Sequence, residues 1–407
     1  MNSSPPLSDE THIEASPPAT TPSQATKLSQ TAAPIPVTSS GRSALWAGIH
    51  GMVVSTSVGQ VLPVLMTTLT SELHLSVTQA GVLAAADLGA ATVASAVYAR
   101  PSAKFALSTV ALVGTVIALV ANLACLLATG FGALLALRLI AGVGAGILTV
   151  ACVTALSQNA SPARAFAMAA FAQTAFGAAL NVAIPSLNAH YGWSACFVVI
   201  AAVTAPGLRI ARYYVRSQTP QAVASRATFT IAGWMAFAAL SIAFCAIGAT
   251  WANLGGLGER SHLTIATIGI AVSGASIAGP VATVLTALVG NRIPSLLGLG
   301  FGSVAMLAGV TLLGLAGSSP LFYAGAIAFM FGWAVYVPYV LGLTSVIDPT
   351  GALTVIATAG ANGGFSLGPL IAVPAIAGWG VGAVPYLAFA LLVCALGLIG
   401  PLTRKNA

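Results

Sequence analysis

The stretch GALLALRLIAGVGAGILTVACVTALS, residues 132–157, contains a single charged side chain, Arg138. A helix needs about 20 predominantly apolar residues to cross the hydrocarbon core of a bilayer, and this stretch is long enough. Inside lipid no water satisfies backbone N–H and C=O groups, so only helices and closed barrels can cross. Apolar and polar residues do not alternate strictly here, which favours a helix over a strand. The stretch therefore predicts a membrane-spanning helix.

Similar apolar runs follow one another from residue 43 to the end of the chain. Only 5% of the 407 residues are charged and 57% are hydrophobic, whereas about a quarter of a soluble domain is charged. So few charges cannot cover the surface of a soluble enzyme or a nucleic-acid-binding protein, and both classes are excluded. At about 30 residues per span and connection, we predict an all-α membrane protein with twelve transmembrane helices, at residues 44–69, 78–98, 105–128, 132–157, 163–187, 194–213, 229–253, 264–288, 293–316, 320–345, 352–377 and 382–402.

Residues 1–42 differ from the rest of the chain, because they are rich in Ser, Thr and Pro. Such a segment has too little apolar surface to bury, so we expect a disordered cytoplasmic tail. It has neither a basic start nor an apolar run and is not a signal peptide. Residues 214–228 are basic and polar, and we expect a cytoplasmic linker there. The predicted domains are two six-helix bundles, residues 43–213 and 229–403, followed by a short cytoplasmic tail, residues 404–407.

The basic residues indicate how the spans are oriented. With a cytoplasmic N-terminus, Arg260 lies outside, Arg138 lies within a span, and the other basic residues fall in cytoplasmic segments. Cytoplasmic loops of membrane proteins carry an excess of Lys and Arg, so the net charge of +7 is interpreted as topology rather than as affinity for nucleic acid. The residues on the cytoplasmic side are Lys27, Arg42, Arg100, Lys104, Arg164, Arg209, Arg212, Arg216, Arg226, Arg292, Arg404 and Lys405.

Short turn sequences occur twice along the chain. The turn after the second span begins Arg100-Pro101-Ser102, and the turn after the eighth includes Arg292 and Pro294-Ser295. A Gly-Trp pair at 192–193 recurs at 378–379, so the offsets are 192 and 186 residues. Both offsets correspond to six spans. Because six is even, the two halves start and end on the same side and are related by an axis along the membrane normal.

The pattern of spans and the repeat resemble those of a known family. In the span at 132–157, Arg138 is followed by Gly142, Gly144 and Gly146. This arrangement resembles the span-four motif of the major facilitator superfamily, and the resemblance covers residues 43–403. It implies a secondary active transporter built from two parallel-repeat bundles, with a cavity near mid-membrane that opens alternately to the two sides.

Two other motifs of that family are incomplete in this sequence. In the loop between spans two and three, Arg100 and Lys104 supply the family's basic residues, but its acid and glycines are missing. The loop's usual charge-relay role is therefore not supported. In span one, Gln60 and Pro63 match the end of a motif of multidrug exporters, but the aspartate of that motif is absent. Drug export is therefore not signalled.

Two ionisable residues lie well inside predicted spans, Asp87 in 78–98 and Arg138 in 132–157. Such a residue at the bilayer centre costs about 2.5–3.5 kcal/mol on insertion scales, so each needs a reason to be there. Burial favours the neutral acid, and we predict that Asp87 binds and releases the coupling proton. The alternative is a purely structural hydrogen bond. Arg138 keeps its charge, and it could bind an anionic substrate, neutralise Asp87 or anchor backbone carbonyls.

Further candidates are polar or aromatic residues within spans. His50 titrates near neutral pH and is a second candidate for proton coupling, although a satisfied structural histidine is the more common case. The amides could bind substrate or merely join helices. Three aromatic residues recur at three-residue spacing in span ten and could form one face beside a cavity or simply pack. With Arg138, the predicted substrate-binding residues are Gln60, Gln173, Asn181, Trp333, Tyr336, Tyr339 and Asn362.

No motif indicates catalysis, a metal or a cofactor. The five cysteines and five histidines show no ligand spacing, and no Walker-type glycine loop is present. We therefore expect a non-enzymatic, monomeric transporter whose partners are lipid, protons and a small amphipathic organic solute, with export favoured. We expect it in a bacterial inner membrane with both termini cytoplasmic. Two alternatives stay open: a proton symporter for uptake of an organic anion, and a non-transporting membrane receptor or assembly factor.

Overall fold

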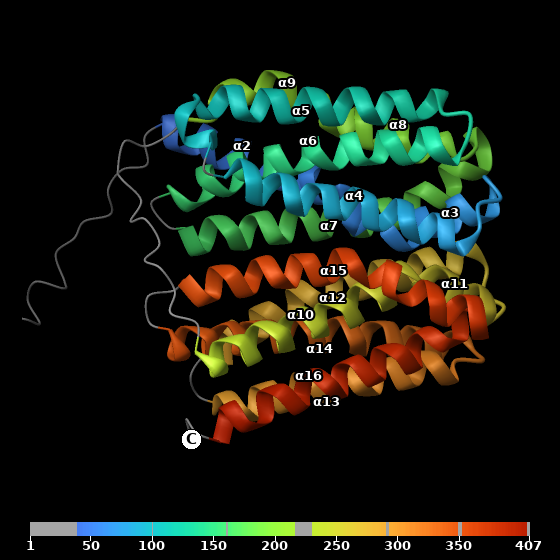
Figure 1. The fold of residues 1–407 in the computed structure, drawn as a ribbon. Coiled ribbons are helices and arrows are strands. Elements are labelled where there is room, and N and C mark those ends of the chain that lie inside the picture. Colours follow the sequence, from blue (N-terminus) through green and yellow to red (C-terminus); the bar gives the residue numbers. More distant parts are fainter. Residues whose placement is uncertain are drawn as a thin grey trace, which may run out of the picture. The chain divides into compact units, whose positions relative to one another are not determined.

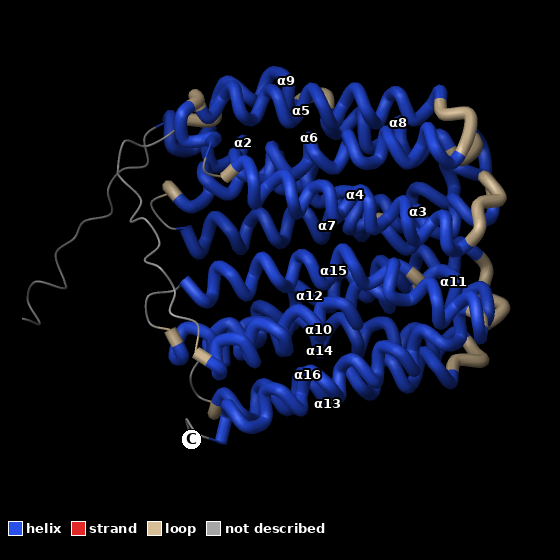
Figure 2. The backbone as a smooth tube through the Cα atoms, viewed as in Figure 1, coloured by secondary structure: helices blue, strands red, loops and turns tan. Residues whose placement is uncertain are grey.

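The computed structural model describes residues 39–99, 101–159, 162–215, 230–289, 293–348 and 352–404. Within these ranges the chain forms helices joined by short loops, and no strand occurs (Figure 2). The expected all-α class is therefore confirmed. Residues 1–38 of the predicted tail, most of the predicted linker and the last three residues lie outside the described ranges.

The first half of the chain contains the helices that precede residue 215 (Figure 1). Arg42 and its neighbours, assigned to the tail by the sequence, are helical, because the first helix already begins at Ser39. The elements are α2 (Ser39–Gln60), α3 (Leu62–Ser71), α4 (Val77–Tyr98), η1 (Pro101–Lys104), α5 (Leu107–Ala124), η2 (Cys125–Leu127), α6 (Phe131–Ser157), α7 (Pro162–Tyr191), α8 (Ser194–Thr204), α9 (Gly207–Ile210) and η3 (Ala211–Tyr213).

The second half contains the helices that follow residue 230. Tyr214, at the edge of the predicted linker, is not a free linker residue, because it is buried and its hydroxyl donates to the Ala47 carbonyl at 2.6 Å. The elements are α10 (Ile231–Ala252), α11 (Leu254–Arg260), α12 (Ile265–Val289), α13 (Ser295–Leu315), α14 (Ser319–Ile347), α15 (Ala352–Trp379), η5 (Val381–Ala383) and α16 (Val384–Arg404).

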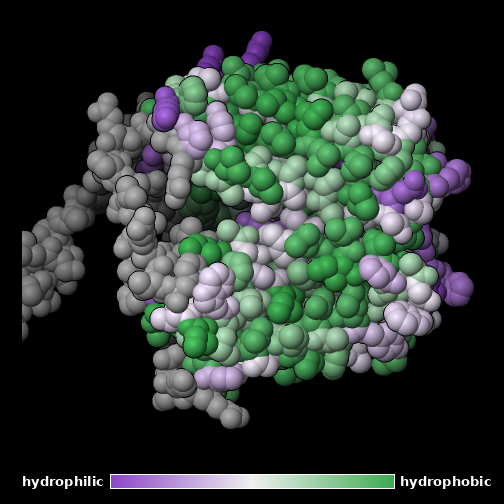
Figure 3. Space-filling model, viewed as in Figure 1, coloured by the Kyte–Doolittle hydropathy of each residue, from purple (hydrophilic) through white to green (hydrophobic). Residues whose placement is uncertain are grey.

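Eleven helices of the described chain are long and apolar enough to cross a membrane, and the number is twelve when the bent pair α2 and α3 is counted as one span. The two parts of that span meet at a bend of 45°. Pro63 is the second residue of α3, and proline cannot donate the backbone hydrogen bond that would continue α2. Figure 3 shows apolar side chains over the middle of the visible face and polar ones toward its two ends. This distribution fits a protein surrounded by lipid.

Unusual backbone angles reveal the repeat more directly than the turn sequences do. His74 and His262 are the non-glycine residues with positive φ in the described chain, at 52° and 57°. Gly192 and Gly380 share a φ of 76°. Each pair is separated by 188 positions, which places Gly380 rather than Gly378 opposite Gly192. The starts of α4 and α12, of α5 and α13, and of α6 and α14 differ by the same 188 positions. These three helix pairs and both pairs of turns therefore share an offset of 188 positions, whereas α2 and α10 start 192 positions apart and α7 and α15 start 190 positions apart.

Equivalent glycines bring equivalent helices together in the two halves. A Cβ on Gly144 of α6 would lie 2.9 Å from the carbonyl oxygen of Gly114 on α5. In the second half, a Cβ on Gly332 of α14 would lie 2.7 Å from the carbonyl oxygen of Gly302 on α13. Small residues of this kind let membrane helices approach backbone to backbone. The same 188-residue offset thus governs packing as well as turns.

Replacing Gly302 by alanine should destabilise the protein. The added methyl would lie 2.8 Å from the Tyr336 backbone nitrogen, which is too close for a carbon, and such overpacking costs about 1–3 kcal/mol. Gly300→Ala is the matched control, because a Cβ there meets nothing within 4 Å on the same helix. Thermal unfolding of both variants in detergent measures the difference. Equal melting temperatures would contradict the close approach of α13 and α14.

Candidate functional site

Asp87 lies in the middle of α4 and is buried against α6. The reason for the close approach is Gly142, because the Asp87 backbone carbonyl occupies the space that a Cβ on this glycine would need. Arg138 lies four residues before Gly142, one helical turn away on the same face of α6. The glycine-rich face found in the sequence therefore places the arginine next to the aspartate.

The two charges form a buried ion pair. Arg138 Nη2 lies 2.8 Å from Asp87 Oδ1, and the side chains are 4% and 7% exposed. Arg138 Nη1 donates to Asn122 Oδ1 at 2.8 Å, and the guanidinium carbon lies 5.4 Å from the centre of the Phe197 ring. Asn122 is held in turn by donating to the Ala118 carbonyl. Of the three roles left open for Arg138, the geometry shows the one of neutralising Asp87.

Asn122 and Phe197 were missed by the sequence analysis. Asn122 is an amide inside the apolar run of α5, which is the same signal that singled out Asn181 and Asn362. Phe197 gives no such signal, because one more aromatic residue in an apolar helix is unremarkable in sequence. Together with Asp87 and Arg138 these residues join α4, α5, α6 and α8 around one charged centre.

Two small cavities touch the ion pair. An apolar cavity of about 10 Å³ lies on the side of α3 and is lined by residues such as Leu62, Leu65 and Met66. A polar cavity of about 20 Å³ lies on the side of α2, where Ser57 and Thr204 contribute hydroxyl groups. A cavity of 10–15 Å³ holds about one water molecule. In this conformation the pair is therefore within reach of water but not of an organic solute.

In the described part of the second half the ion pair has no counterpart. The residues 188 positions after Asp87, Asn122 and Arg138 are Ala275, Val310 and Ala326. All three have a relative exposure of 0%. Where the first half places charge between its helices, the second half places aliphatic side chains. The two halves share a fold but not an electrostatic centre.

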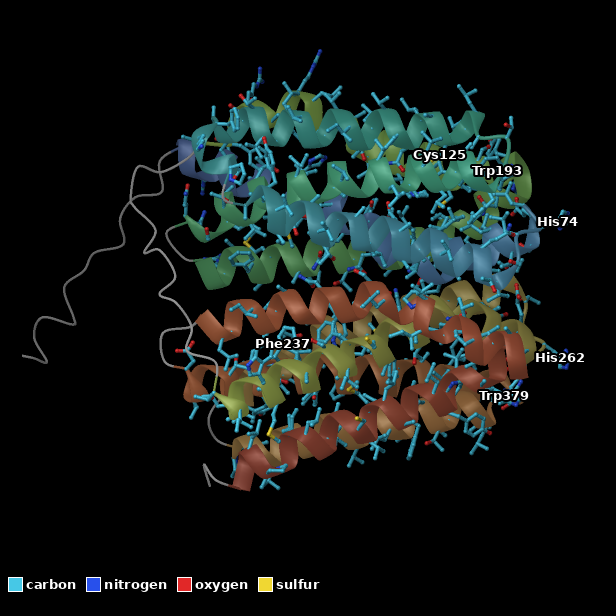
Figure 4. The ribbon with its side chains drawn as sticks, in the orientation of Figure 1. His74, Cys125, Trp193, Phe237, His262 and Trp379 are labelled. Atoms are coloured by element: carbon cyan, nitrogen blue, oxygen red, sulfur yellow. The ribbon has the colours of Figure 1, made fainter. Side chains whose placement is uncertain are left out.

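The halves contact each other toward the end of the bundle where α3 and α11 lie. Three hydrogen bonds between first-half and second-half helices occur on this side and near the middle. Trp251 Nε1 donates to the Gly59 carbonyl at 2.8 Å, and Ser273 Oγ donates to the Ala178 carbonyl at 2.7 Å. The Thr92 and Ser366 hydroxyls lie 3.1 Å apart. This end, which includes His74 and His262 (Figure 4), is closed, and we call it the closed end.

Toward the other end the same helix faces separate. Asn362 is exposed although it lies one turn from the buried Ser366. Phe171, two turns before Ala178, is 66% exposed, and Ile277, one turn after Ser273, is 53% exposed. The visible surface is hollowed between the halves there (Figure 3). We call this the basic end, because Arg42, Lys104, Arg164, Arg209 and Arg212 lie there. A cleft between the halves thus opens toward the basic end.

Three of the predicted amides lie between α2 and α7 beside this cleft. Gln173 Oε1 accepts a hydrogen bond from the Thr56 hydroxyl at 2.8 Å. Asn181 Nδ2 donates to the Gln60 carbonyl at 3.1 Å, and the Gln60 side chain packs on Gly177. Asn362 is exposed on α15, and no hydrogen bond to these amides accompanies it among the described residues. Gln173 and Asn181 lie eight residues apart on α7, about 12 Å along the helix, and each bonds to α2 at a different level.

The aromatic residues of α14 do not share one face. Trp333 makes an edge contact with Phe244 of α10, with ring centres 6.2 Å apart. Tyr339 points toward a different helix, with its ring over Gly298 of α13. Tyr336 is buried at 2% exposure, and its backbone also faces α13. The three-residue spacing rotates successive side chains by about 60°, so Trp333 lies nearest the interface with α10.

His50 lies apart from the ion pair. Its Nε2 is 3.1 Å from the Val203 carbonyl, and its ring lies against Gly207 at the start of α9. These contacts join α2 to the end of α8. No group of three or more potential metal ligands occurs among the residues that the structure describes.

Replacing one member of the ion pair should lower the stability of the fold more than replacing both members. Asp87→Asn leaves the Arg138 charge buried without a counter-charge, which costs about 3–5 kcal/mol. The double variant Asp87→Leu/Arg138→Met replaces the pair by apolar groups and should restore most of that loss. Thermal unfolding in detergent, followed by tryptophan fluorescence, compares the two. A double variant less stable than the single one would show that the pair is not energetically coupled.

The open cleft predicts a pattern of chemical labelling. In a Cys394→Ser background, which removes the one exposed cysteine of the described chain, Asn362→Cys should react quickly with a water-soluble maleimide. Ser366→Cys, one turn away and buried, should react at least about tenfold more slowly, as an opening cost of about 1.4 kcal/mol would give. Equal rates at the two positions would contradict a cleft that closes between them.

Comparison with solved structures identifies the same fold. One crystal structure, described as a bacterial homolog to the human lysosomal transporter Spinster in an inward-facing and unoccupied conformation, matches with a TM-score of 0.61. The match covers 90% of this chain and 96% of that chain at 15% identity, so it shows the fold alone. No curated protein matches this chain.

The sequence also matches a family model directly. The model describes the Major Facilitator Superfamily, and it matches residues 48–355, well over half of the chain. This match agrees with the helical fold, with the candidate membrane spans and with the glycine-rich face that follows Arg138. The chain therefore belongs to the Major Facilitator Superfamily and is a multi-pass membrane protein of the secondary-transporter kind, not an enzyme.

Proposed function

We propose that this transporter moves a small amphipathic organic solute by alternating access, that protons drive it through Asp87, and that its direction is export. The observation that carries the proposal is the buried Asp87–Arg138 pair, which the first half has and the second half lacks. A charged pair in a membrane bundle is expensive to maintain and marks a functional site by default.

Protonation of Asp87 would alter the balance of charges in the first half. The neutral acid no longer compensates Arg138, whose other hydrogen bonds in the described chain go to the Asn122 amide and to the Cys125 sulfur. The polar cavity supplies space for a water molecule that delivers or removes the proton. Because guanidinium stays protonated, the exchangeable proton belongs to Asp87.

The position of Asp87 links this charge to the contact between the halves. Thr92, about one turn further along α4, is hydrogen-bonded to Ser366 of α15. α4 therefore carries both the protonatable residue and part of the surface that must separate when the closed end opens. A change in the ion pair between Arg138 and α4 would therefore alter the Thr92–Ser366 contact. This arrangement supports the proposed link between proton binding at Asp87 and alternating access.

The cleft favours a weakly charged, amphipathic solute. Its described walls present amides such as Gln173 and Asn362 beside apolar side chains such as Phe171 and Ile277. Arg138 is 3% exposed and donates hydrogen bonds to Asp87, Asn122 and Cys125, so it is not available to a carboxylate in this conformation. No observation therefore favours the alternative of a symporter for organic anions. Trp333 makes its ring contact with Phe244 of α10, within the second half.

Charge distribution supports the orientation. The basic end holds Arg42, Lys104 and Arg164, while the closed end holds Glu72, Glu259 and Arg260. Under the positive-inside rule the basic end is cytoplasmic, and the cleft then faces the cytoplasm with both termini on that side. We propose a monomer in a bacterial inner membrane.

A proteoliposome assay tests the coupling. Vesicles containing a pH-sensitive dye are exposed to amphipathic cations, neutral aromatic compounds and aromatic carboxylates in turn. We expect proton movement with at least one amphipathic solute. The variant Asp87→Asn/Arg138→Gln, which removes both charges together, should abolish proton movement while downhill solute exchange continues.

His50→Gln is the matched control, because glutamine keeps a hydrogen-bonding side chain near the Val203 carbonyl but cannot titrate. It should retain coupled proton movement. If proton coupling survives in the double variant and disappears in His50→Gln, then His50, and not Asp87, is the residue that carries the coupled proton. Absence of any solute-dependent flux in the parent would favour a non-transporting receptor.

A further inference from the structure

The first span of each half is broken at the same place. In the first half α2 gives way to α3 at Val61, and in the second half α10 gives way to α11 at Asn253. These two residues have nearly identical backbone angles, with φ of −97° and −99° and ψ of 7° at both. They lie 192 positions apart, which is also the offset between the starts of α2 and α10. The two breaks therefore belong to the repeat.

Equivalent residues beside the two breaks contact each other across the halves. Trp251 Nε1 donates to the carbonyl of Gly59, which is the residue 192 positions earlier and hence its own equivalent. Beyond the breaks, a Cβ on Gly255 would lie 2.8 Å from the carbonyl oxygen of Pro63, again its own equivalent. In a two-fold arrangement a residue meets its own equivalent only near the axis. The breaks thus meet at the axis between the halves.

The Gly59 carbonyl needs a hydrogen-bond donor from outside its own helix. In a continuous helix it would accept from the N–H of the residue four positions on, which here is Pro63. Proline has no N–H, and inside a bilayer no lipid group replaces the missing donor. The Trp251 indole supplies one at a distance of 2.8 Å. Since Trp251 is only 4% exposed, its ring lies within the bundle and not at the membrane surface.

A second carbonyl released by a proline lies at the same interface. Pro185 within α7 leaves the Asn181 carbonyl without its helical donor. A Cβ on Gly269 of α12 would lie 2.5 Å from that oxygen, so the second half packs closely here as well. Glycine offers this oxygen only a weak Cα–H contact. Of these two carbonyls, the one of Gly59 is therefore the one that receives an N–H donor from the second half in the described chain.

We propose that the hydrogen bond from Trp251 to Gly59 is the latch of the closed end. When this end opens, α10 leaves α2, and the Gly59 oxygen loses the donor that replaces the missing N–H of Pro63. The latch therefore favours the arrangement in which the cleft is open toward the basic end. Trp251 is a positioning residue, because it acts through the arrangement of the halves. The inference rests on the alternating access of the proposed function, but it involves neither Asp87 nor a proton.

Cysteine labelling in detergent tests the latch without a solute or a proton gradient. In a Cys394→Ser background, Thr67→Cys reports opening of the closed end, because Thr67 is 6% exposed and lies against Gly255 across the halves. Trp251→Phe keeps an aromatic ring but removes the indole N–H. It should make Thr67→Cys react about three to ten times faster with a water-soluble maleimide, the effect of one hydrogen bond between membrane helices.

Two internal comparisons separate opening of this end from a general loss of packing. The native Cys196 in α8 is fully buried in the first half, and it should keep its reaction rate in Trp251→Phe. Trp193→Phe is the matched control, because Trp193 lies toward the same end (Figure 4) and makes an edge contact with Phe197 within the first half. Its indole N–H has no hydrogen-bond partner among the described residues, so this variant should leave the Thr67→Cys rate unchanged.

A double-variant comparison tests the cause of the latch. Pro63→Ala returns an N–H to the position four residues after Gly59, so this carbonyl depends less on the other half. In the Pro63→Ala background, Trp251→Phe should therefore change the Thr67→Cys rate by less than about twofold. A tryptophan that acted only by filling space would give the same acceleration in both backgrounds.

Four results would overturn the latch. They are no acceleration of Thr67→Cys in Trp251→Phe, an equal acceleration in Trp193→Phe, an undiminished effect in the Pro63→Ala background, and a parallel acceleration at Cys196. None of them bears on proton coupling, which the proteoliposome assay measures. Conversely, a protein without solute-dependent flux but with the expected labelling would lose the proposed transport function and keep the latch.

Discussion

The absence of water inside the bilayer is the constraint on which this structure depends. Every backbone donor must be satisfied within its own segment, so the chain consists of helices, and the helices must then attract one another without a hydrophobic driving force. Glycines meet that need by letting backbones touch. Gly142 brings α6 against the carbonyl of Asp87, and the approach lets Arg138, one turn away, reach the carboxylate. The charged centre is thus a product of backbone packing as much as of electrostatics.

The ion pair and the interface between the halves lie on the same helix, α4. Asp87 faces inward to α6, while Thr92 faces α15 across the interface. Charge within one half and contact between both halves are therefore separate features carried by one rigid element. The second half, with Ala275, Val310 and Ala326 at the equivalent positions, supplies a partner surface without a charge of its own.

Much of the fold follows from the sequence, because span length and charge placement are properties that lipid enforces directly. The cost of placing a charge inside lipid also singled out Asp87 and Arg138. It did not predict their contact, because that contact depends on which face of α6 Gly142 turns toward α4. The turn sequences suggested offsets of 192 and 186, whereas the left-handed turns and three pairs of helix starts differ by 188 positions and other helix pairs by 190 or 192, because the connecting segments vary in length. The aromatic residues of α14 could not be assigned from spacing. A shift of three positions turns a side chain far enough to reach a different neighbour, so Trp333 contacts Phe244 while Tyr339 contacts Gly298.

The internal repeat also bears on how such a molecule can differ from a pair of identical subunits. Two copies of a single repeat, assembled about the same axis, would hold every side chain in duplicate, and an aspartate at position 87 would force a second one at position 275. When the two repeats are joined in one chain, equivalent positions can carry different residues. The fused molecule can carry an odd number of buried charged centres, and the described part of this chain carries one. A symmetric dimer would have been limited to an even number of such centres.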